Sequence, residues 1–527
     1  MAYPVLAAQN TWFAPTVSTI AKVDITEIEI MDSYTPDSSV TVVDSWDASA
    51  TKDGSITCYV IGTKIIIAGN GSGKIAMNPD SSMIFYNFAE VLSITGLELL
   101  DSSEVTNILM AFNSCKKVQS LNIGTWDVSK VENAIGLFGQ CYLLESVDNI
   151  SVWDVSNMTM VNQMFYYCKS LTTIDLSRWN INSIKSLYAM FFYCENLTTV
   201  NISNWDVSTV TLFDDMFCMC TSLKTVHMDN WKFGSASCCN MFQADSALQT
   251  LDVSHWDVAN VPDMSVMFYQ CSSLGEIDVS NWDVSKVTNL DHFAAHANLK
   301  RKGMEKWDTR SLINANAAFH NCAEEELDLS GWDVSKVQFF CQMFENSPNL
   351  KRIKGLDKWD TSSGIGFDEM FGRCSKLEEL DLFSFNTTKA KNGTSASTNG
   401  HKTATLKDMF ASCNNLKKVK VGANFSINGD GSNTTAANKA ILPTPSTDYI
   451  TGADGNWYTI NGDSYAPNAM KDKTTETYYA SYDIVADIDV IVKNGSLLDA
   501  AKAIREKNGM TNRYTPAQFG AAIRALS

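Results

Sequence analysis

The stretch from Trp153 to Trp179 reads WDVSNMTMVNQMFYYCKSLTTIDLSRW, and variants of this phrase fill the chain from about residue 97 to residue 421. Its tryptophan recurs every 25 to 27 residues, at Trp126, Trp153, Trp179, Trp205, Trp231, Trp256, Trp282, Trp307, Trp332 and Trp359. A period this regular indicates stacked supersecondary units, because no single unit of this size can bury its own apolar face. The pattern predicts a repeat solenoid.

Each repeat carries two apolar patterns joined by a turn. Residues 171–177, LTTIDLS, alternate apolar and polar side chains, which predicts a half-buried strand. The Trp-Asp-Val-Ser that follows supplies Asp and Ser side chains, which cap turns or helices. The recurring Met-Phe-x-x-Cys then places apolar residues three and four apart, which predicts one face of a short helix. We therefore expect an α/β solenoid of about 26 residues per repeat with strands about 4.8 Å apart.

The cysteines follow the same period. Eight of the fourteen occupy one slot of the repeat: Cys115, Cys141, Cys168, Cys194, Cys220, Cys271, Cys322 and Cys374. Ser246, His296 and Ser347 are assigned to rungs where the cysteine is missing. A slot that recurs every turn and accepts other small or polar residues is typical of a buried core position. We expect reduced thiols rather than disulfides, in keeping with folding in a reducing cytoplasm.

One column of polar residues follows the strands and is the candidate binding surface. If the apolar strand residues face inward, these side chains face outward, on the concave surface: Asn122, Asp175, Asn201, His227, Asp252, Asp278, Asp328 and Asp381. Adjacent carboxylates repel unless they are hydrated or bridged, so calcium or a network of sugar hydroxyls would suit the column. A solvated strand face is the expected alternative.

Catalytic and metal-binding patterns are weak. His292 and His296 are four residues apart, which suits a metal on one face of a helix, and His320 lies about one repeat further on. An imidazole satisfied by its neighbours is the favoured reading, so we expect no metal and no cofactor. A uniform acid column lacks the unequal pair of carboxylates that glycoside hydrolysis needs. No nucleophile elbow, phosphate loop or dinucleotide fingerprint is found, and we expect no enzyme activity.

Composition excludes other classes of protein. The net charge of -18 and the pI near 4.8 argue against binding to a nucleic-acid backbone. No stretch reaches the roughly 20 apolar residues that span a bilayer, and the first residues show no signal-peptide pattern. We therefore expect no nucleic-acid partner and no membrane insertion.

The chain is expected to have five parts. These are a β-rich attachment segment (1–45), a β cap (46–96) with a hairpin at Gly62 and Thr63, the solenoid (97–425), a terminator region (426–483) and a helical hairpin (484–527). In the last part an amphipathic pattern starts at Ser496, and Thr515 with Pro516 marks the start of a second helix. The β cap would cover the exposed apolar end of the stack.

The combined pattern of Trp-Asp-Val-Ser-x-Val, Met-Phe-x-x-Cys and Leu-x-x-Leu-Asp-Leu-Ser-x-Trp resembles the BspA-like leucine-rich repeats of bacterial surface proteins. The resemblance covers roughly 330 residues. Residues 503–507, AIREK, with the later Thr-Pro-Ala-Gln-Phe resemble a helical-hairpin ending of bacteriophage tail and other structural proteins. These resemblances imply a solenoid that binds extended partners and a terminal module that attaches it to a larger assembly.

The function expected from both resemblances is that of a bacteriophage structural protein, such as a tail fibre, decoration protein or adhesin. It would assemble in the host cytoplasm, join other virion proteins through a terminal module, and bind a glycan or protein of the host surface. A bacterial cell-surface adhesin of the BspA-like type is the alternative. Homo-oligomers are common among virion fibres, although no coiled-coil heptads impose one here.

Overall fold

The computed structural model of the chain describes residues 3–16, 19–228, 231–297, 299–390, 406–429, 439–461 and 463–481. The chain divides into two compact units, Met1–Asp283 and Val284–Ser527. The expected helical hairpin at 484–527 lies outside the described residues. Helical turns in the described part are short 3-10 segments: η1 (Lys22–Asp24), η2 (Leu97–Leu99), η3 (Ile150–Val152), η4 (Met304–Lys306) and η5 (Leu356–Lys358). Within these described ranges, no helix has the length and hydropathy to cross a membrane.

Unit 1 begins with a five-stranded sheet of order β2-β3-β4-β1-β6. Its strands are β1 (Glu27–Met31), β2 (Asp44–Asp47), β3 (Thr57–Ile61), β4 (Lys64–Ala68) and β6 (Ser93–Thr95). The predicted hairpin is confirmed, because β3 and β4 pair antiparallel across Gly62 and Thr63. Strand β1 lies between β4 and β6 and is parallel to both. Residues of the expected attachment segment and of the expected β cap therefore share one sheet.

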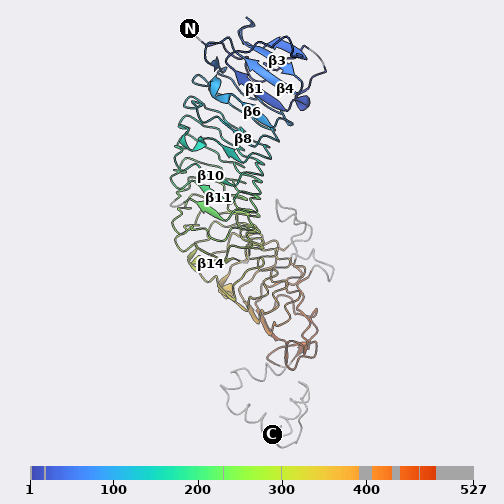
Figure 1. Ribbon diagram of the computed structural model, residues 1–527. Helices are drawn as coiled ribbons and strands as arrows, with labels where there is room; N and C mark the ends of the chain where they lie inside the picture. Colours follow the sequence, from blue (N-terminus) through green and yellow to red (C-terminus); the bar gives the residue numbers. More distant parts are fainter. Residues whose placement is uncertain are drawn as a thin grey trace, which may run out of the picture. The chain divides into compact units, whose positions relative to one another are not determined.

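The repeats of unit 1 follow this cap, and most of them add a short strand. These are β5 (Ile75–Ala76), β7 (Leu100–Asp101), β8 (Ser120–Leu121), β9 (Ser146–Val147), β10 (Thr173–Asp175), β11 (Thr199–Asn201), β12 (Thr225–His227) and β13 (Glu276–Asp278). Figure 1 shows β8, β10 and β11 stacked in order below β6. Strands β10, β11 and β12 are parallel and in register, so Ile174, Val200 and Val226 form one buried row. The predicted strands are confirmed.

The predicted short helix is wrong, because Met-Phe-x-x-Cys forms a run of tight turns. In the repeat that starts at Trp153, Gln163 and Tyr167 have φ of 59° and 60°, which a right-handed helix excludes. Their N–H groups donate to the carbonyls of Tyr188 and Phe192 in the next repeat, at 2.9 and 2.8 Å. Alternate N–H groups thus bond between repeats rather than within one. A chain of turns still returns an apolar side chain inward every three or four residues, which explains the helix-like pattern.

Unit 2 has the same repeat and a different end. Its strands are β14 (Lys300–Lys302), β15 (Glu326–Asp328), β16 (Arg352–Lys354), β17 (Glu379–Leu382), β18 (Lys418–Val421), β19 (Trp457–Tyr458), β20 (Ser464–Tyr465) and β21 (Glu476–Tyr479). Strands β15–β16 and β17–β18 pair in parallel, whereas β21 pairs antiparallel with β18. Strand β21 therefore covers the edge that a further repeat would otherwise occupy.

Rows of identical side chains fill the core. The rings of Phe138, Phe165, Phe191 and Phe217 stack with centroids 5.4 to 5.5 Å apart. The tryptophans are buried, and most donate their indole N–H to a carbonyl of the preceding repeat, as Trp205 does to Leu176 at 2.8 Å. These contacts join successive repeats, so the stack acts as one core within each unit.

The thiols form a third row, and two of the predicted occupants of their slot are wrong. Most thiols in the slot donate to a phenylalanine carbonyl of the preceding repeat, as Cys194 does to Phe165 at 3.1 Å. All fourteen cysteines are free, which confirms the expected reduced thiols. The slot holds buried Asp245 and Ala297, whereas Ser246 and His296 lie one position away and are exposed. Ser347 occupies the slot as predicted and donates to the Phe319 carbonyl at 3.1 Å.

Candidate functional site

The predicted strand column is present in register, with its side chains half-exposed or exposed. Asp175, Asn201 and His227 are neighbours on β10, β11 and β12. The column residues Asn122, Asp252, Asp278, Asp328 and Asp381 occupy the same position in other repeats. In unit 2 the column is not uniformly acidic, because Asp328 is paired with Lys354 and Asp381 with Lys420.

The carboxylates of this column have local partners. Asp175 accepts a hydrogen bond from the Ser177 N–H at 2.9 Å, and Asp328 accepts one from Ser330 at 3.1 Å. Hydrogen bonds from the backbone and side chain of Ser177 lower the pKa of Asp175. In unit 2 the Lys420 ammonium lies 3.0 Å from the Asp381 carboxylate. Capping of each turn explains the recurrence of Asp and Asn, so the recurrence does not by itself indicate a ligand.

The two histidines of the predicted pair, His292 and His296, both lie in turns. His320, in the next repeat, contacts His296. His292 and His296 have φ of 54° and 58°, so they do not share a helix face. The His292 Nδ1 lies 2.6 Å from an Asp291 carboxylate oxygen, and the His296 ring lies 4.2 Å from the His320 ring. Among the described residues, no group of three or more His, Cys, Asp or Glu side chains is arranged to hold a metal ion.

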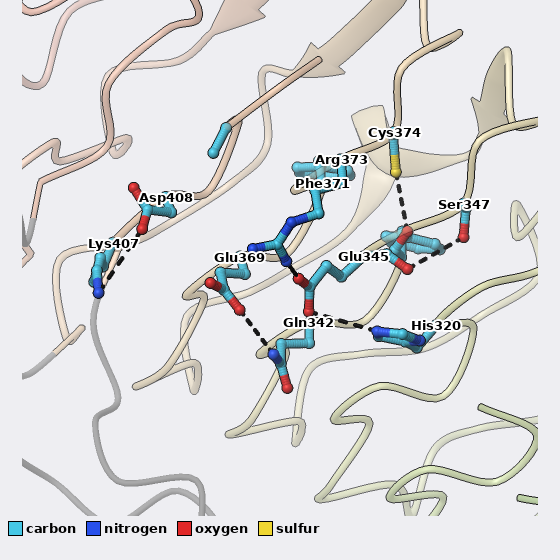
Figure 2. Close-up of polar contacts among 12 residues, drawn as sticks. His320, Gln342, Glu345, Ser347, Glu369, Phe371, Arg373, Cys374, Lys407 and Asp408 are labelled. Carbon is cyan, nitrogen blue, oxygen red and sulfur yellow. Dashed lines mark hydrogen bonds and ion pairs between the residues drawn. The ribbon is translucent and has the colours of Figure 1, made fainter. Parts of the chain in front are cut away.

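Figure 2 shows how the next repeats surround His320. The buried Glu345 carboxylate lies 3.6 Å from His320 Nε2 and also pairs with Arg373, whose side chain is largely exposed. Gln342 donates to Glu369 at 2.7 Å beside this pair. Burial, followed by the neighbouring imidazoles, lowers the pKa of His320 to about 4. The imidazole is therefore neutral near pH 7, and the group links three repeats.

A cluster of aromatic side chains lies on the turn segments of unit 1. The sequence analysis assigned only core residues to these segments. The two residues before the thiol slot point outward, and in two consecutive repeats they are aromatic: Tyr166 and Tyr167, then Phe192 and Tyr193. Tyr166 stacks with Phe192 at 5.2 Å and Tyr167 with Tyr193 at 4.6 Å, measured between ring centroids. Tyr142 lies 6.5 Å from Tyr167. We call these five residues the aromatic ladder.

Charged and aliphatic side chains border the aromatic ladder. The Lys169 ammonium lies 4.6 Å from the Tyr193 centroid and 2.9 Å from the Glu195 carboxylate. Lys116 lies 5.7 Å from the Tyr142 centroid, and Leu143 beside it is 43% exposed. The doubled aromatic residues at 166–167 and 192–193 were the signal in the sequence, but their contact across repeats is visible only in the fold.

The fold does not require aromatic residues at these positions. In neighbouring repeats the same two positions are Gly139 and Gln140, Cys218 and Met219, or Gln243 and Ala244. Those repeats make the same turns and the same hydrogen bonds to the next repeat, as Gln140 does to Tyr166 at 2.6 Å. The aromatic ladder is therefore an addition to the fold, of the kind that marks an interaction surface.

Comparison with solved structures finds bacterial leucine-rich-repeat proteins. A leucine-rich cell-surface protein of Faecalibacterium prausnitzii A2-165 is 13% identical, covering 74% of this chain and 97% of that chain with a TM-score of 0.26. A leucine-rich-repeat protein of Eubacterium ventriosum ATCC 27560 is 11% identical, covering 79% and 99% with a TM-score of 0.32. A leucine-rich-repeat protein of Leptospira interrogans is 12% identical, covering 60% and 84% with a TM-score of 0.22. The comparison with curated proteins gave no match.

A family model described as "Mycoplasma protein of unknown function, DUF285" matches the repeats in five overlapping segments. They are residues 80–200, 185–307, 235–330, 274–355 and 316–397. Together they extend from residue 80 to residue 397, which is more than half of the 527 residues. The chain therefore belongs to the DUF285 family of repeat proteins.

Proposed function

We propose that this chain is a non-catalytic binding protein of a bacterial cell surface and that the aromatic ladder holds a protein partner. The single observation that carries the proposal is the aromatic ladder itself, because several other repeats carry no aromatic residue at the equivalent positions and, among the described residues, only here do such residues stack from one repeat to the next in pairs. Tyrosine supplies a large contact area with few rotatable bonds and is enriched in the energetic centres of protein interfaces.

A protein partner suits the ladder better than a sugar does. Sugar rings stack on open aromatic faces, whereas here Tyr167 and Tyr193 face one another and Lys169 lies over Tyr193. Leu143, beside the ladder, adds an exposed aliphatic side chain. Tyrosine hydroxyls and an aliphatic side chain suit a polypeptide, which offers both carbonyl groups and apolar side chains.

The absence of catalysis is part of the proposal. The acids of the strand column cap their own turns or pair with lysines, and the His320 group is closed by Glu345. None of these arrangements offers a pair of unequal carboxylates across a substrate-sized space.

A second candidate, a component of a bacteriophage particle, rests on a different observation. The sequence of residues 484–527 resembles the helical ending of phage tail proteins, and this segment lies outside the described residues. The aromatic ladder would then bind a protein of the host surface, and other virion proteins would hold the terminal segment. A homo-oligomer would be compatible with either location.

Location is tested by labelling intact cells of the producing culture with a membrane-impermeant biotin reagent and by analysing purified phage particles with mass spectrometry. Recovery among the biotinylated proteins, with absence from the particles, is the expected result. Stoichiometric recovery in the particles would replace the cell-surface proposal with the phage proposal.

Binding is tested with the fluorescently labelled chain on intact cells from the same habitat. The double variant Tyr167→Gln with Tyr193→Met uses residues that adjacent repeats carry at this position, so the fold should be kept. We expect it to lose about tenfold or more in affinity, since a central tyrosine contributes about 2 kcal/mol. The matched control is Tyr269→Gln, in a repeat outside the ladder.

The class of partner is tested on the target cells. Protease treatment of their surface should abolish binding, whereas periodate oxidation of surface glycans should not. If the double variant binds as well as the Tyr269→Gln control does, the aromatic ladder is not the docking surface.

A further inference from the structure

We infer that unit 1 carries a second binding site, for a linear neutral oligosaccharide, in a polar groove that four consecutive repeats form. The groove has a volume of about 490 Å³ and is open along one side. Its lining residues are Thr106, Lys130, Glu132, Asn157, Thr159 and Ser183. The inference goes beyond the proposed function, because it involves none of the residues of the aromatic ladder.

The repeat positions these side chains at regular intervals. Next to the groove, Asn107, Asn133 and Met160 form parallel bridges from one repeat to the next. The Glu132 N–H donates to the Thr106 carbonyl at 2.8 Å, and the Thr159 N–H donates to the Glu132 carbonyl at 2.9 Å. Strand-like spacing of about 4.8 Å per repeat makes the row from Thr106 to Ser183 about 14 Å long. A polymer whose repeating unit is close to the spacing of about 4.8 Å between repeats, such as a chain of hexoses, can follow the row.

The hydrogen bonds of the lining leave oxygen acceptors facing the groove. The Thr159 hydroxyl donates to the Glu132 carbonyl at 3.3 Å, and the Ser183 hydroxyl donates to the Ser156 carbonyl at 2.7 Å. The Asn157 amide donates to the Ser129 carbonyl at 2.6 Å. Because the hydroxyl donors of Thr159 and Ser183 and one amide N–H of Asn157 are engaged with backbone, the lone pairs of these side-chain oxygens remain to accept hydrogen bonds. Their positions are set before any ligand arrives, which lowers the entropic cost of binding.

The charges of the groove favour a neutral ligand. The Lys130 ammonium lies 2.6 Å from the Glu104 carboxylate, so its charge is compensated, and the Glu132 carboxylate is exposed beside it. The lining contains no aromatic or large aliphatic side chain that would anchor a protein. A ligand must therefore supply many hydroxyl donors, little charge and an extended shape. Polysaccharides meet these three conditions.

The test is isothermal titration of the purified full chain with three neutral hexasaccharides, of the cello, malto and chito series, and with a sulfated hexasaccharide. We expect at least one neutral hexasaccharide to bind and the sulfated one not to bind, because an acidic chain repels it. The variant Asn157→Ala with Thr159→Val removes two acceptors and should weaken binding about tenfold.

The matched control is Thr211→Val. The Thr211 hydroxyl donates to the Lys185 carbonyl at 3.1 Å, as Thr159 does in its own repeat, but Thr211 does not line the groove. We expect its affinity to be unchanged. Equal losses in the two variants, full affinity in the double variant, or no binding of any neutral hexasaccharide at millimolar concentration would overturn the inference.

A third variant separates this inference from the proposed function. Tyr167→Gln with Tyr193→Met should keep the hexasaccharide affinity while it loses cell binding. Loss of both in this variant would show that the groove is not an independent site.

Discussion

Asp245 is the side chain whose replacement should change the stability of unit 1 most clearly. It occupies the thiol slot and is fully buried, with Cys220 and Cys271 in the same slot of the adjoining repeats. One carboxyl oxygen accepts the Cys220 N–H at 2.9 Å, whereas the other makes no hydrogen bond with any described residue. Burial raises the pKa of Asp245 well above its usual value. The folded protein therefore keeps this carboxyl neutral up to a higher pH than the unfolded chain does.

The sign of the pH dependence follows from this raised pKa. Above about pH 4 the unfolded chain releases the Asp245 proton while the folded chain keeps it, so the folded state binds more protons. The free energy of unfolding then falls by about 1.4 kcal/mol per pH unit until the folded carboxyl ionises.

The variant Asp245→Cys should abolish this loss, because a thiol already fills the slot in most repeats and donates to a phenylalanine carbonyl there. Urea unfolding of wild type and variant at several pH values, followed by tryptophan fluorescence, measures the difference. The matched control is Ser347→Cys in unit 2, which fills the same slot without removing an ionisable carboxyl and should give a pH-independent difference. A constant difference between wild type and Asp245→Cys from pH 4 to pH 7 would refute the neutral-carboxyl argument.

Three further predictions concern other parts of the core. Trp205→Phe should lower the free energy of unfolding more than Trp153→Phe by about 1 kcal/mol, because only the Trp205 indole N–H has a hydrogen-bond partner; urea unfolding compares the two. Glu324→Gln should destabilise unit 2 by about 3 kcal/mol, since it leaves the buried Arg301 guanidinium without its carboxylate at 2.8 Å. Arg301→Leu introduces the residue type that the next strand carries at this position. Combined with Glu324→Gln, it should restore the melting temperature. A double variant that does not recover would contradict the ion-pair account. Iodoacetamide should label native protein first at Cys239, the one half-exposed cysteine, as peptide mass spectrometry would show, and rapid labelling of the slot thiols would contradict their burial.

Much of the fold could be predicted because its signals are local and repeated. The alternation in residues 171–177 predicts a strand with Ile174 inside, and burial on one face of a strand is a property of the segment itself. The hairpin at Gly62 and Thr63 and the Asp caps of the Trp-Asp-Val-Ser turns are equally local, as the bond from the Ser208 N–H to Asp206 at 3.0 Å shows. The slot for the thiols followed from their period.

The candidate surfaces depended on contacts between residues that are distant in sequence. The acids of the strand column were found from the period, but their roles as turn caps and lysine partners needed the geometry. The aromatic ladder joins residues one repeat apart, and the groove joins four repeats. Neither can be recognised within a single copy of the phrase.

By itself, the sequence determined that this protein is a stack of repeats and that most of them carry one strand, one tryptophan and one buried slot. Only the tertiary structure decided that the Met-Phe segment forms turns, because the partners of its N–H groups lie in the next repeat rather than four residues back. The tertiary structure also decided that Asp245 occupies the thiol slot, because a period of 25 to 27 residues locates the slot only to within one position. Packing against the neighbouring repeats selects that register, since a shift of one residue would expose the row of core side chains and bury the outward ones.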